Sequence, residues 1–288
     1  MVYRLPHFTL VVLAGLLAAC STRQATTPTG PAADDQAGRF IWQELLTDDV
    51  QAAQRFYGGL FSWQFEETER LGKPYILVRA GGQPVAGITA VERENPDEPV
   101  AQWLSYLFVA DVDEAAKNFK DAGGDILVAP LSLSGTARAA LVTDPGGAPL
   151  GLVSTDAELP PSPADPPIGR FFWRDYFAKD VEGSLAFYRQ FPGYRVQEEG
   201  EADSVHYVFR HGTGGQAIAG LIPIGDSPVR PNWLPYVRVA DPAALARRAS
   251  ELGGTVLLEP RPDAREGSLA IVADPNGGAL ALQKWPIS

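Results

Sequence analysis

Two short patterns in the sequence place an indole next to a carboxylate. The first is Trp42-x-Glu44 and the second is Trp173-x-Asp175, and both stand in apolar, aromatic segments. In a β-strand residues i and i+2 point to the same face, so each carboxylate would lie beside an indole. A carboxyl group in such apolar surroundings can have a raised pKa and act as a general acid or base. Glu44 and Asp175 are therefore candidate catalytic residues.

Other side chains suited to catalysis or metal binding are few. After Cys20 the chain has two histidines, His206 and His211, which stand five residues apart in a predicted strand and should point to opposite faces. A single imidazole cannot form the usual zinc or iron site, and we find no dense cluster of carboxylates. His206 is a third candidate catalytic residue, and its simpler interpretation is an exposed or hydrogen-bonded histidine without a catalytic role.

Cys20 is the one cysteine of the chain, and its position indicates a lipid anchor rather than a disulfide. It follows an apolar run from Phe8 to Ala19, and the two residues directly before the cysteine, Ala18 and Ala19, are small. Arg4 is the only charged residue before that run. This pattern resembles a bacterial lipobox, which implies cleavage before Cys20 and acylation of the new N-terminus. Because Ser21 rather than Asp follows, we expect an outer-membrane anchor with the protein facing the periplasm; an ordinary signal peptide is the alternative.

The composition indicates a packed globular protein with an acidic surface. The net charge is −11 and apolar residues make up 45% of the chain. An acidic surface argues against nucleic-acid binding and against electrostatic attachment to anionic lipid headgroups. The acidic surface says little about a small substrate. We expect the membrane as a partner through Cys20 and a small molecule as a possible ligand, and the sequence identifies no protein partner.

The chain contains an internal duplication, which determines its organisation. The segment beginning Gly38-Arg-Phe-Ile-Trp recurs as Gly169-Arg-Phe-Phe-Trp, and further matches follow in the same order at nearly the same spacing. They are Phe56-Tyr57 with Phe187-Tyr188, Trp103 with Trp233, Gly123-Gly124 with Gly253-Gly254, and Asp144-Pro145 with Asp274-Pro275. We expect a signal peptide at 1–19, the lipidated cysteine and a flexible tether at 20–37, domains at 38–157 and 169–288, and a Pro-rich linker at 158–168.

Each copy is itself predicted to consist of two βαβββ units. In the first copy a strand at 40–46 precedes a helix that starts at Asp49 and carries apolar residues at helical spacing. In the second unit a strand at 103–109 precedes a helix over 112–122, with Asp111 as the N-cap. Three further strands follow each helix, and the last two are joined by an Asp-Pro turn.

In order and spacing these motifs resemble the vicinal oxygen chelate superfamily, which includes glyoxalases, bleomycin-resistance proteins and extradiol dioxygenases. The resemblance covers nearly all of residues 38–286. It implies an α+β fold of two tandem domains, in each of which two βαβββ units form a curved mixed sheet around a cleft. It also implies a divalent metal in each cleft. The implied ligand positions fall on Trp42, Leu104 and Gly151 in the first copy and on Trp173, Leu234 and Ala281 in the second.

None of those six residues can donate a lone pair to a metal, since indole has only an N–H donor and the others are apolar. We therefore predict no cofactor and no family-type metal site. If Trp42 faces the cleft, strand alternation places Glu44 there too, and Tyr106 on the neighbouring strand; Trp173, Asp175 and Tyr236 match them in the second copy. We interpret these six residues as ligand-binding.

Three functions remain open from the sequence. The first is metal-independent binding of a small molecule in the aromatic clefts. The second is an enzyme that uses Glu44 or Asp175, or a metal at new positions, and the third is an envelope scaffold that binds a protein partner. A purely structural interpretation also stands: the aromatic residues fill the barrel, and Glu44 and Asp175 pair with Arg39 and Arg170.

Overall fold

The computed structural model describes residues 36–93, 100–133, 136–159, 165–200, 206–212 and 215–286. The predicted signal peptide, Cys20 and nearly all of the tether lie outside these ranges, as does part of the Pro-rich linker. No helix within them is long and apolar enough to span a bilayer.

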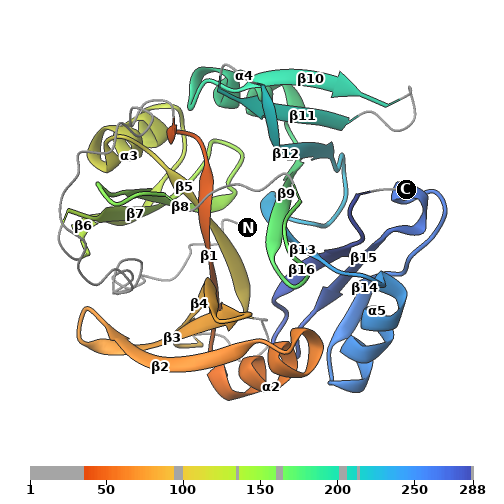
Figure 1. Cartoon of the computed structure of the whole chain (residues 1–288). Helices are drawn as coiled ribbons and strands as arrows, with labels where there is room; N and C mark the ends of the chain where they lie inside the picture. Colours follow the sequence, from red (N-terminus) through yellow and green to blue (C-terminus); the bar gives the residue numbers. More distant parts are fainter. Residues whose placement is uncertain are drawn as a thin grey trace.

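The first domain is an eight-stranded sheet with two helices on its outer face (Figure 1). Its strand order is β2-β3-β4-β1-β5-β8-β7-β6, so the two βαβββ units meet where β1 pairs antiparallel with β5. Within each unit the first and last strands pair in parallel. The elements are β1 (Phe40–Thr47), α2 (Val50–Phe61), β2 (Gln64–Arg70), β3 (Lys73–Ala80), β4 (Gln83–Ala90), β5 (Gln102–Phe108), α3 (Val112–Asp121), β6 (Ile126–Ser132), β7 (Arg138–Thr143) and β8 (Pro149–Ser154).

The second domain repeats this topology with the strand order β10-β11-β12-β9-β13-β16-β15-β14. The predicted α+β fold of two tandem domains with curved mixed sheets is confirmed (Figure 1). The elements are β9 (Phe171–Ala178), α4 (Val181–Gln190), β10 (Arg195–Glu199), β11 (His206–His211), β12 (Gln216–Pro223), β13 (Asn232–Arg238), α5 (Pro242–Glu251), β14 (Thr255–Leu258), the 3₁₀ turn η1 (Arg265–Gly267), β15 (Leu269–Ala273) and β16 (Ala279–Gln283).

Each of the four helices in the described residues begins after an aspartate, as the sequence predicts for the helices at Asp49 and Asp111. Asp49, Asp111, Asp180 and Asp241 each accept a hydrogen bond from a backbone N–H of the first helical turn. A carboxylate at this position satisfies a donor that has no partner within the helix and also lies favourably in the field of the helix dipole. Local sequence therefore determines where each helix starts.

The helices of the two domains pair across the interface rather than within one domain. Helix α2 of the first domain packs against α5 of the second, and the two lie side by side in Figure 1. At the other end, Phe119 of α3 makes an edge-to-face contact with Phe187 of α4 at a centroid distance of 4.9 Å. Two hydrophobic clusters each combine residues of both domains, so the outer faces of the sheets are buried against the partner domain.

The residues that recur in the two copies hold this interface together. The Tyr57 hydroxyl donates to Asp274 Oδ2 at 3.0 Å, and in the equivalent place the Tyr188 hydroxyl donates to Asp144 Oδ2 at 2.7 Å. An indole N–H, from Trp103 or Trp233, donates to each tyrosine oxygen. The recurring Phe-Tyr, Trp and Asp-Pro motifs therefore contact the other domain and do not line a ligand site.

We expect Tyr57→Phe and Tyr188→Phe each to lower the free energy of unfolding by about 1–3 kcal/mol, because each removes the partner of a buried carboxylate oxygen and of an indole N–H. Urea denaturation measures the change. Tyr207→Phe is the control: in the part of the chain that the structure describes, the Tyr207 hydroxyl has no hydrogen bond. Its effect should stay within about 0.5 kcal/mol, and equal losses in all three variants would contradict the role of the interdomain bonds.

Candidate functional site

The inner face of each sheet carries one carboxylate at its centre. Glu44 and Asp175 occupy equivalent places on β1 and β9: each is next to a leucine of the antiparallel neighbour and opposite a glycine of the parallel one. The glycine is required for space, since a Cβ on Gly220 would lie 2.2 Å from Asp175 Oδ1. As predicted from strand alternation, Tyr106 and Tyr236 lie on the same faces as these carboxylates. The Tyr236 hydroxyl donates to Asp175, whereas the buried Tyr106 hydroxyl has no hydrogen-bond partner among the described residues.

The six residues at the implied metal-ligand positions lie on these inner faces, and none of them has a side-chain atom that could bind a metal. Tyr106 pairs with both Trp42 and Gly151, and its ring takes the space beside Gly151, where a Cβ would be 2.1 Å from a ring carbon. Within the described ranges no group of three or more His, Cys, Asp and Glu side chains is placed to hold a metal ion. The residues present do not fit the family's divalent metal, so we derive no step through it.

In the first domain the carboxylate is sealed in a buried polar cluster. Glu44 has no exposed surface, and both terminal nitrogens of Arg70 donate to its Oε2 at 2.8 Å. Thr89 donates to the other carboxylate oxygen, and the Arg70 guanidinium lies 4.1 Å from the centroid of the Tyr75 ring. Burial raises the pKa of Glu44, and the charge of Arg70 opposes that shift.

In the second domain a different arginine neutralises the carboxylate. Asp175 accepts hydrogen bonds from Trp173 Nε1 at 2.7 Å, from the Tyr236 hydroxyl at 2.5 Å and from Arg265 Nη2 at 2.7 Å. Arg265 also donates to Gln283 Oε1 at 3.0 Å. The three donors occupy both carboxylate oxygens of Asp175, an arrangement that suits a structural or orienting role.

Arg265 reaches the site from a turn with unusual backbone geometry. Arg265 and Glu266 have φ values of 47° and 56°, in the left-handed region that non-glycine residues seldom adopt. The turn η1 directs the guanidinium over the Tyr236 ring, at 5.0 Å from its centroid. The side chain keeps 26% of its surface exposed, in contrast to 4% for Arg70.

The carboxylates do not pair with Arg39 and Arg170, which was one of the alternatives that the sequence left open. Arg39 donates to Gln36, and Arg170 donates to the carbonyl of Ala80 at 3.0 Å. The arginines that do pair with Glu44 and Asp175 are separated from them by 26 and 90 residues respectively. They do not occupy equivalent positions in the repeat, so the duplication gave no signal for either.

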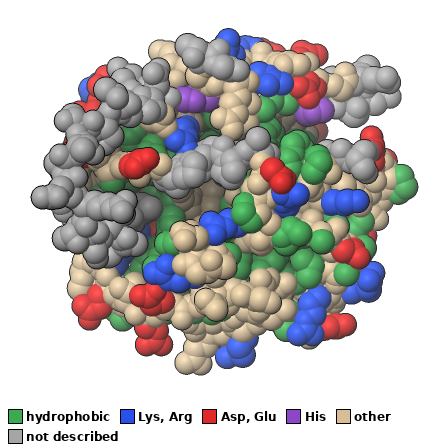
Figure 2. All heavy atoms as spheres, in the orientation of Figure 1, with side chains coloured by type: hydrophobic (Ala, Val, Ile, Leu, Met, Phe, Trp, Pro, Cys, Tyr) green, Lys and Arg blue, Asp and Glu red, His purple; other side chains and the backbone are tan. Residues whose placement is uncertain are grey.

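The two inner faces differ in exposure, although their topology is the same. In the first domain Trp42 and Leu46 are both 7% exposed and belong to a hydrophobic cluster. Their equivalents Trp173 and Phe177 are only partly buried. Two other matched pairs on neighbouring strands differ in the same way: Phe108 and Leu141 are buried, whereas their equivalents Arg238 and Ile271 are partly exposed. Figure 2 shows hydrophobic side chains with basic ones beside them on the side of the molecule that belongs to the second domain.

His206 lies on the inner face and His211 on the outer one, as their odd spacing predicts. Val208 of β11 pairs with Gly220, whose missing Cβ would face Asp175, so His206 shares the face of Asp175. His211 instead contacts the carbonyl of Ala37 on the interdomain side. His206 Nε2 is 3.6 Å from Glu199 Oε2.

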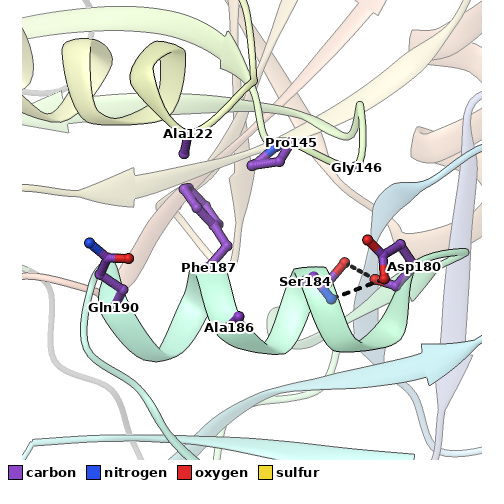
Figure 3. Close-up of a pocket in the computed structure, with 9 residues that line it drawn as sticks. Ala122, Pro145, Gly146, Asp180, Ser184, Ala186, Phe187 and Gln190 are labelled. Atoms are coloured by element: carbon purple, nitrogen blue, oxygen red, sulfur yellow. Dashed lines mark hydrogen bonds between the residues drawn. The ribbon is translucent and has the colours of Figure 1, made fainter.

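A groove of about 270 Å³ lies between the domains (Figure 3), and it differs in character from the inner faces. Phe187 of α4 points across it toward Ala122 and Pro145. At the equivalent seam Leu252 and Asn276 fill the space that Ala122 and Gly146 leave here. The polar groups of the groove are bonded locally, since the Ser184 hydroxyl donates to the Asp180 carbonyl and Asp180 caps α4. The lining of this groove therefore gives no indication of a ligand.

Arg70→Met should lower the free energy of unfolding by about 3–5 kcal/mol, because it leaves Glu44 buried without its counter-charge. Arg265→Met should cost less, since Asp175 keeps its Trp173 and Tyr236 donors and Arg265 is partly exposed. Urea denaturation of both variants at neutral pH tests the order, and a larger loss in Arg265→Met would contradict it.

The loss in Arg70→Met should also depend on pH. Removing Arg70 deletes an influence that lowers the pKa of Glu44, so the pKa in the folded state rises further above the unfolded value of about 4.3. The folded variant then binds the Glu44 proton more tightly than the unfolded chain does, and its stability falls as pH rises between those two values. We therefore expect a smaller difference from the unmodified protein at about pH 5 than at about pH 7.5; unfolding curves that give equal differences would contradict this.

Comparisons with known proteins agree with the fold and the duplication. Residues 39–152 match the family model described as Glyoxalase/Bleomycin resistance protein/Dioxygenase superfamily, and residues 172–282 match a glyoxalase-like domain. The anthracycline biosynthesis protein DauV of Streptomyces sp. is 31% identical over 268 residues, which cover 85% of this chain and 92% of that protein. DnrV of Streptomyces peucetius, named likewise, is 29% identical with the same coverage.

A solved structure extends the comparison to the fold. The Mn(II)-bound glyoxalase from Novosphingobium aromaticivorans superposes with a TM-score of 0.56 at 14% identity, covering 86% of this chain and 82% of that one. At this identity the similarity concerns the fold alone. With both of its domains matched by family models and a relative of similar length above 30% identity, the chain belongs to the glyoxalase/bleomycin resistance protein/dioxygenase superfamily.

Proposed function

We propose that this protein is an exported, lipid-anchored member of the superfamily that binds a planar aromatic small molecule without a metal, on the inner face of its second domain. The observation that carries the proposal is the difference between the two inner faces. The first is a packed core around a sealed ion pair, whereas in the second Trp173 and Phe177 keep exposed surface around a partly exposed arginine.

The chemistry of this face suits an aromatic compound that carries oxygen atoms. Apolar walls with a few convergent polar groups are typical of small-molecule sites, and aromatic rings stack on flat ligands. A guanidinium has five N–H donors, and Arg265 uses two of them in its bonds to Asp175 and Gln283. Its remaining donors fit a carbonyl, carboxylate or phenolate oxygen of a ligand.

The relatives indicate which compounds to test first. DauV and DnrV are named for anthracycline biosynthesis, and anthracyclines are planar polycyclic quinones. We propose hydroxyanthraquinones and related polycyclic quinones as the ligand class. In the first domain the buried Trp42, Glu44 and Tyr106 then have a structural role, which replaces the ligand-binding role expected from the sequence.

The site of action follows from the N-terminal segment. The small residues before Cys20 and the serine after it support acylation of Cys20 and retention at the outer membrane, facing the periplasm. The tether would then hold the two domains close to the membrane, where apolar aromatic compounds partition.

Phe177→Ala should weaken the binding of a hydroxyanthraquinone roughly tenfold, because it removes apolar surface against which the ligand packs. Isothermal titration calorimetry of the purified protein measures this change in affinity. Leu46→Ala is the matched control in the first domain and should leave the affinity unchanged even though it removes a buried side chain. Absence of binding to the unmodified protein, or an equal loss in Leu46→Ala, would contradict the proposal.

Chelation should not affect this binding. We expect the same affinity before and after dialysis against EDTA, since the inner-face residues at the family's metal positions have no lone pair to offer. A loss of affinity that added divalent metal restores would show instead that the protein uses a metal at other positions.

The anchor can be tested in cells grown with an alkyne-labelled fatty acid. The unmodified protein should carry the label and fractionate with the outer membrane, whereas Cys20→Ser should be unlabelled and released, because no acyl chain is then attached. Label in the Cys20→Ser variant, or its absence in both, would rule out the anchor without affecting the ligand proposal.

A further inference from the structure

One tyrosine closes the inner face of the first domain. Tyr75 on β3 is 2% exposed, and its hydroxyl occupies the space above Gly87, where a Cβ would lie only 1.6 Å from the tyrosine oxygen. The side chains of Trp42 and Arg70 lie beside this residue, and the Arg70 guanidinium stacks on its ring at 4.1 Å from the centroid. Tyr75 therefore bridges the tryptophan and the arginine that surround Glu44, and leaves no room for a ligand beside them.

The sheet register identifies the residue of the second domain that stands in the place of Tyr75. In the first domain Gly87 pairs with Glu44 on one side and with Leu77 on the other, and Tyr75 is two residues before Leu77. In the second domain Gly220 pairs with Asp175 and Val208, and His206 is two residues before Val208. His206 is thus the structural equivalent of Tyr75, and the offset of 131 residues that relates Phe56 to Phe187 places them at the same position of the repeat.

His206 does not close the second inner face as Tyr75 closes the first. Its side chain is 42% exposed and is directed toward Glu199 at 3.6 Å, and Arg210 approaches the same carboxylate at 3.6 Å. The indole N–H of Trp173 donates to Asp175. Among the described residues of β11, none covers Trp173 as Tyr75 covers Trp42.

We propose that His206 is the residue that keeps the ligand site of the second domain open, and that its imidazole contacts one end of the ligand while Arg265 contacts the other. The contact with a ligand rests on the proposed function, whereas the open face rests on the sheet register alone. His206 and the carboxylate that Arg265 binds are two strands apart, on the order of 10 Å. A ligand that reaches both carries oxygen atoms at the two ends of two or three fused rings, with its apolar middle over Trp173 and Phe177.

The experiment exchanges the two equivalent residues. In His206→Tyr the phenol should cover Trp173 as Tyr75 covers Trp42, and the affinity for a hydroxyanthraquinone should fall by more than about tenfold. His206→Gln is the matched comparison: it removes the imidazole contact but adds no ring, so the face should stay open and the affinity should fall less than in His206→Tyr. Titration calorimetry gives both affinities, with circular dichroism to verify folding.

A readout that needs no ligand separates this inference from the proposed function. Hydroxyl-radical footprinting should show Trp173 less oxidised in His206→Tyr than in the unmodified protein, and Trp42 more oxidised in the reciprocal variant Tyr75→His. If His206→Tyr does not fold, Tyr75→His with the Trp42 readout decides the question. Unchanged oxidation in folded variants would overturn the role of His206. Protection of Trp173 without any binding to the unmodified protein would support that role and refute the proposed ligand.

Discussion

The hydrogen bonds that run from Tyr57 to Asp274 and from Tyr188 to Asp144 join the two domains at equivalent places, and each lies inside a hydrophobic cluster built from both domains. The outer face of each curved sheet needs apolar cover, and its own helices supply only part of it. Pairing α2 with α5 and α3 with α4 completes the cover. Burial raises the pKa of both aspartates, so their tyrosine and backbone donors are needed to hold them inside the interface.

Because the interface holds the outer faces, the inner faces of the two domains were free to diverge. One carries Trp, Glu, Tyr and Thr around an arginine from β2, and all of these side chains are buried. The other carries Trp, Asp and Tyr around an arginine from a strained turn, and part of its apolar surface is exposed. Duplication thus produced one domain whose inner face is a packed core and another whose inner face keeps exposed apolar surface.

The carboxylate at the centre of each inner face is paired with an arginine, and the two arginines come from different places in the fold. A buried carboxylate is costly unless opposite charge and hydrogen bonds compensate it. Both domains supply an arginine and a hydroxyl, from Thr89 in the first domain and from Tyr236 in the second. In the first domain the arginine comes from the same βαβββ unit as Glu44, and in the second it comes from the other unit. The same electrostatic requirement is met from unrelated positions, so the repeat could not reveal it.

The sequence by itself determined the duplication, the four βαβββ units, the helix starts at aspartates and the residue types at the family's metal positions. These depend on local propensity, on strand and helix periodicity and on the chemistry of single side chains. It placed Glu44, Tyr106, Asp175 and Tyr236 on the correct faces for the same reason. Only the tertiary structure decided that Arg70 and Arg265 neutralise the carboxylates, and that one inner face is closed. Those features depend on which distant strands become neighbours and on how much space their side chains leave, and short-range patterns carry no information about either.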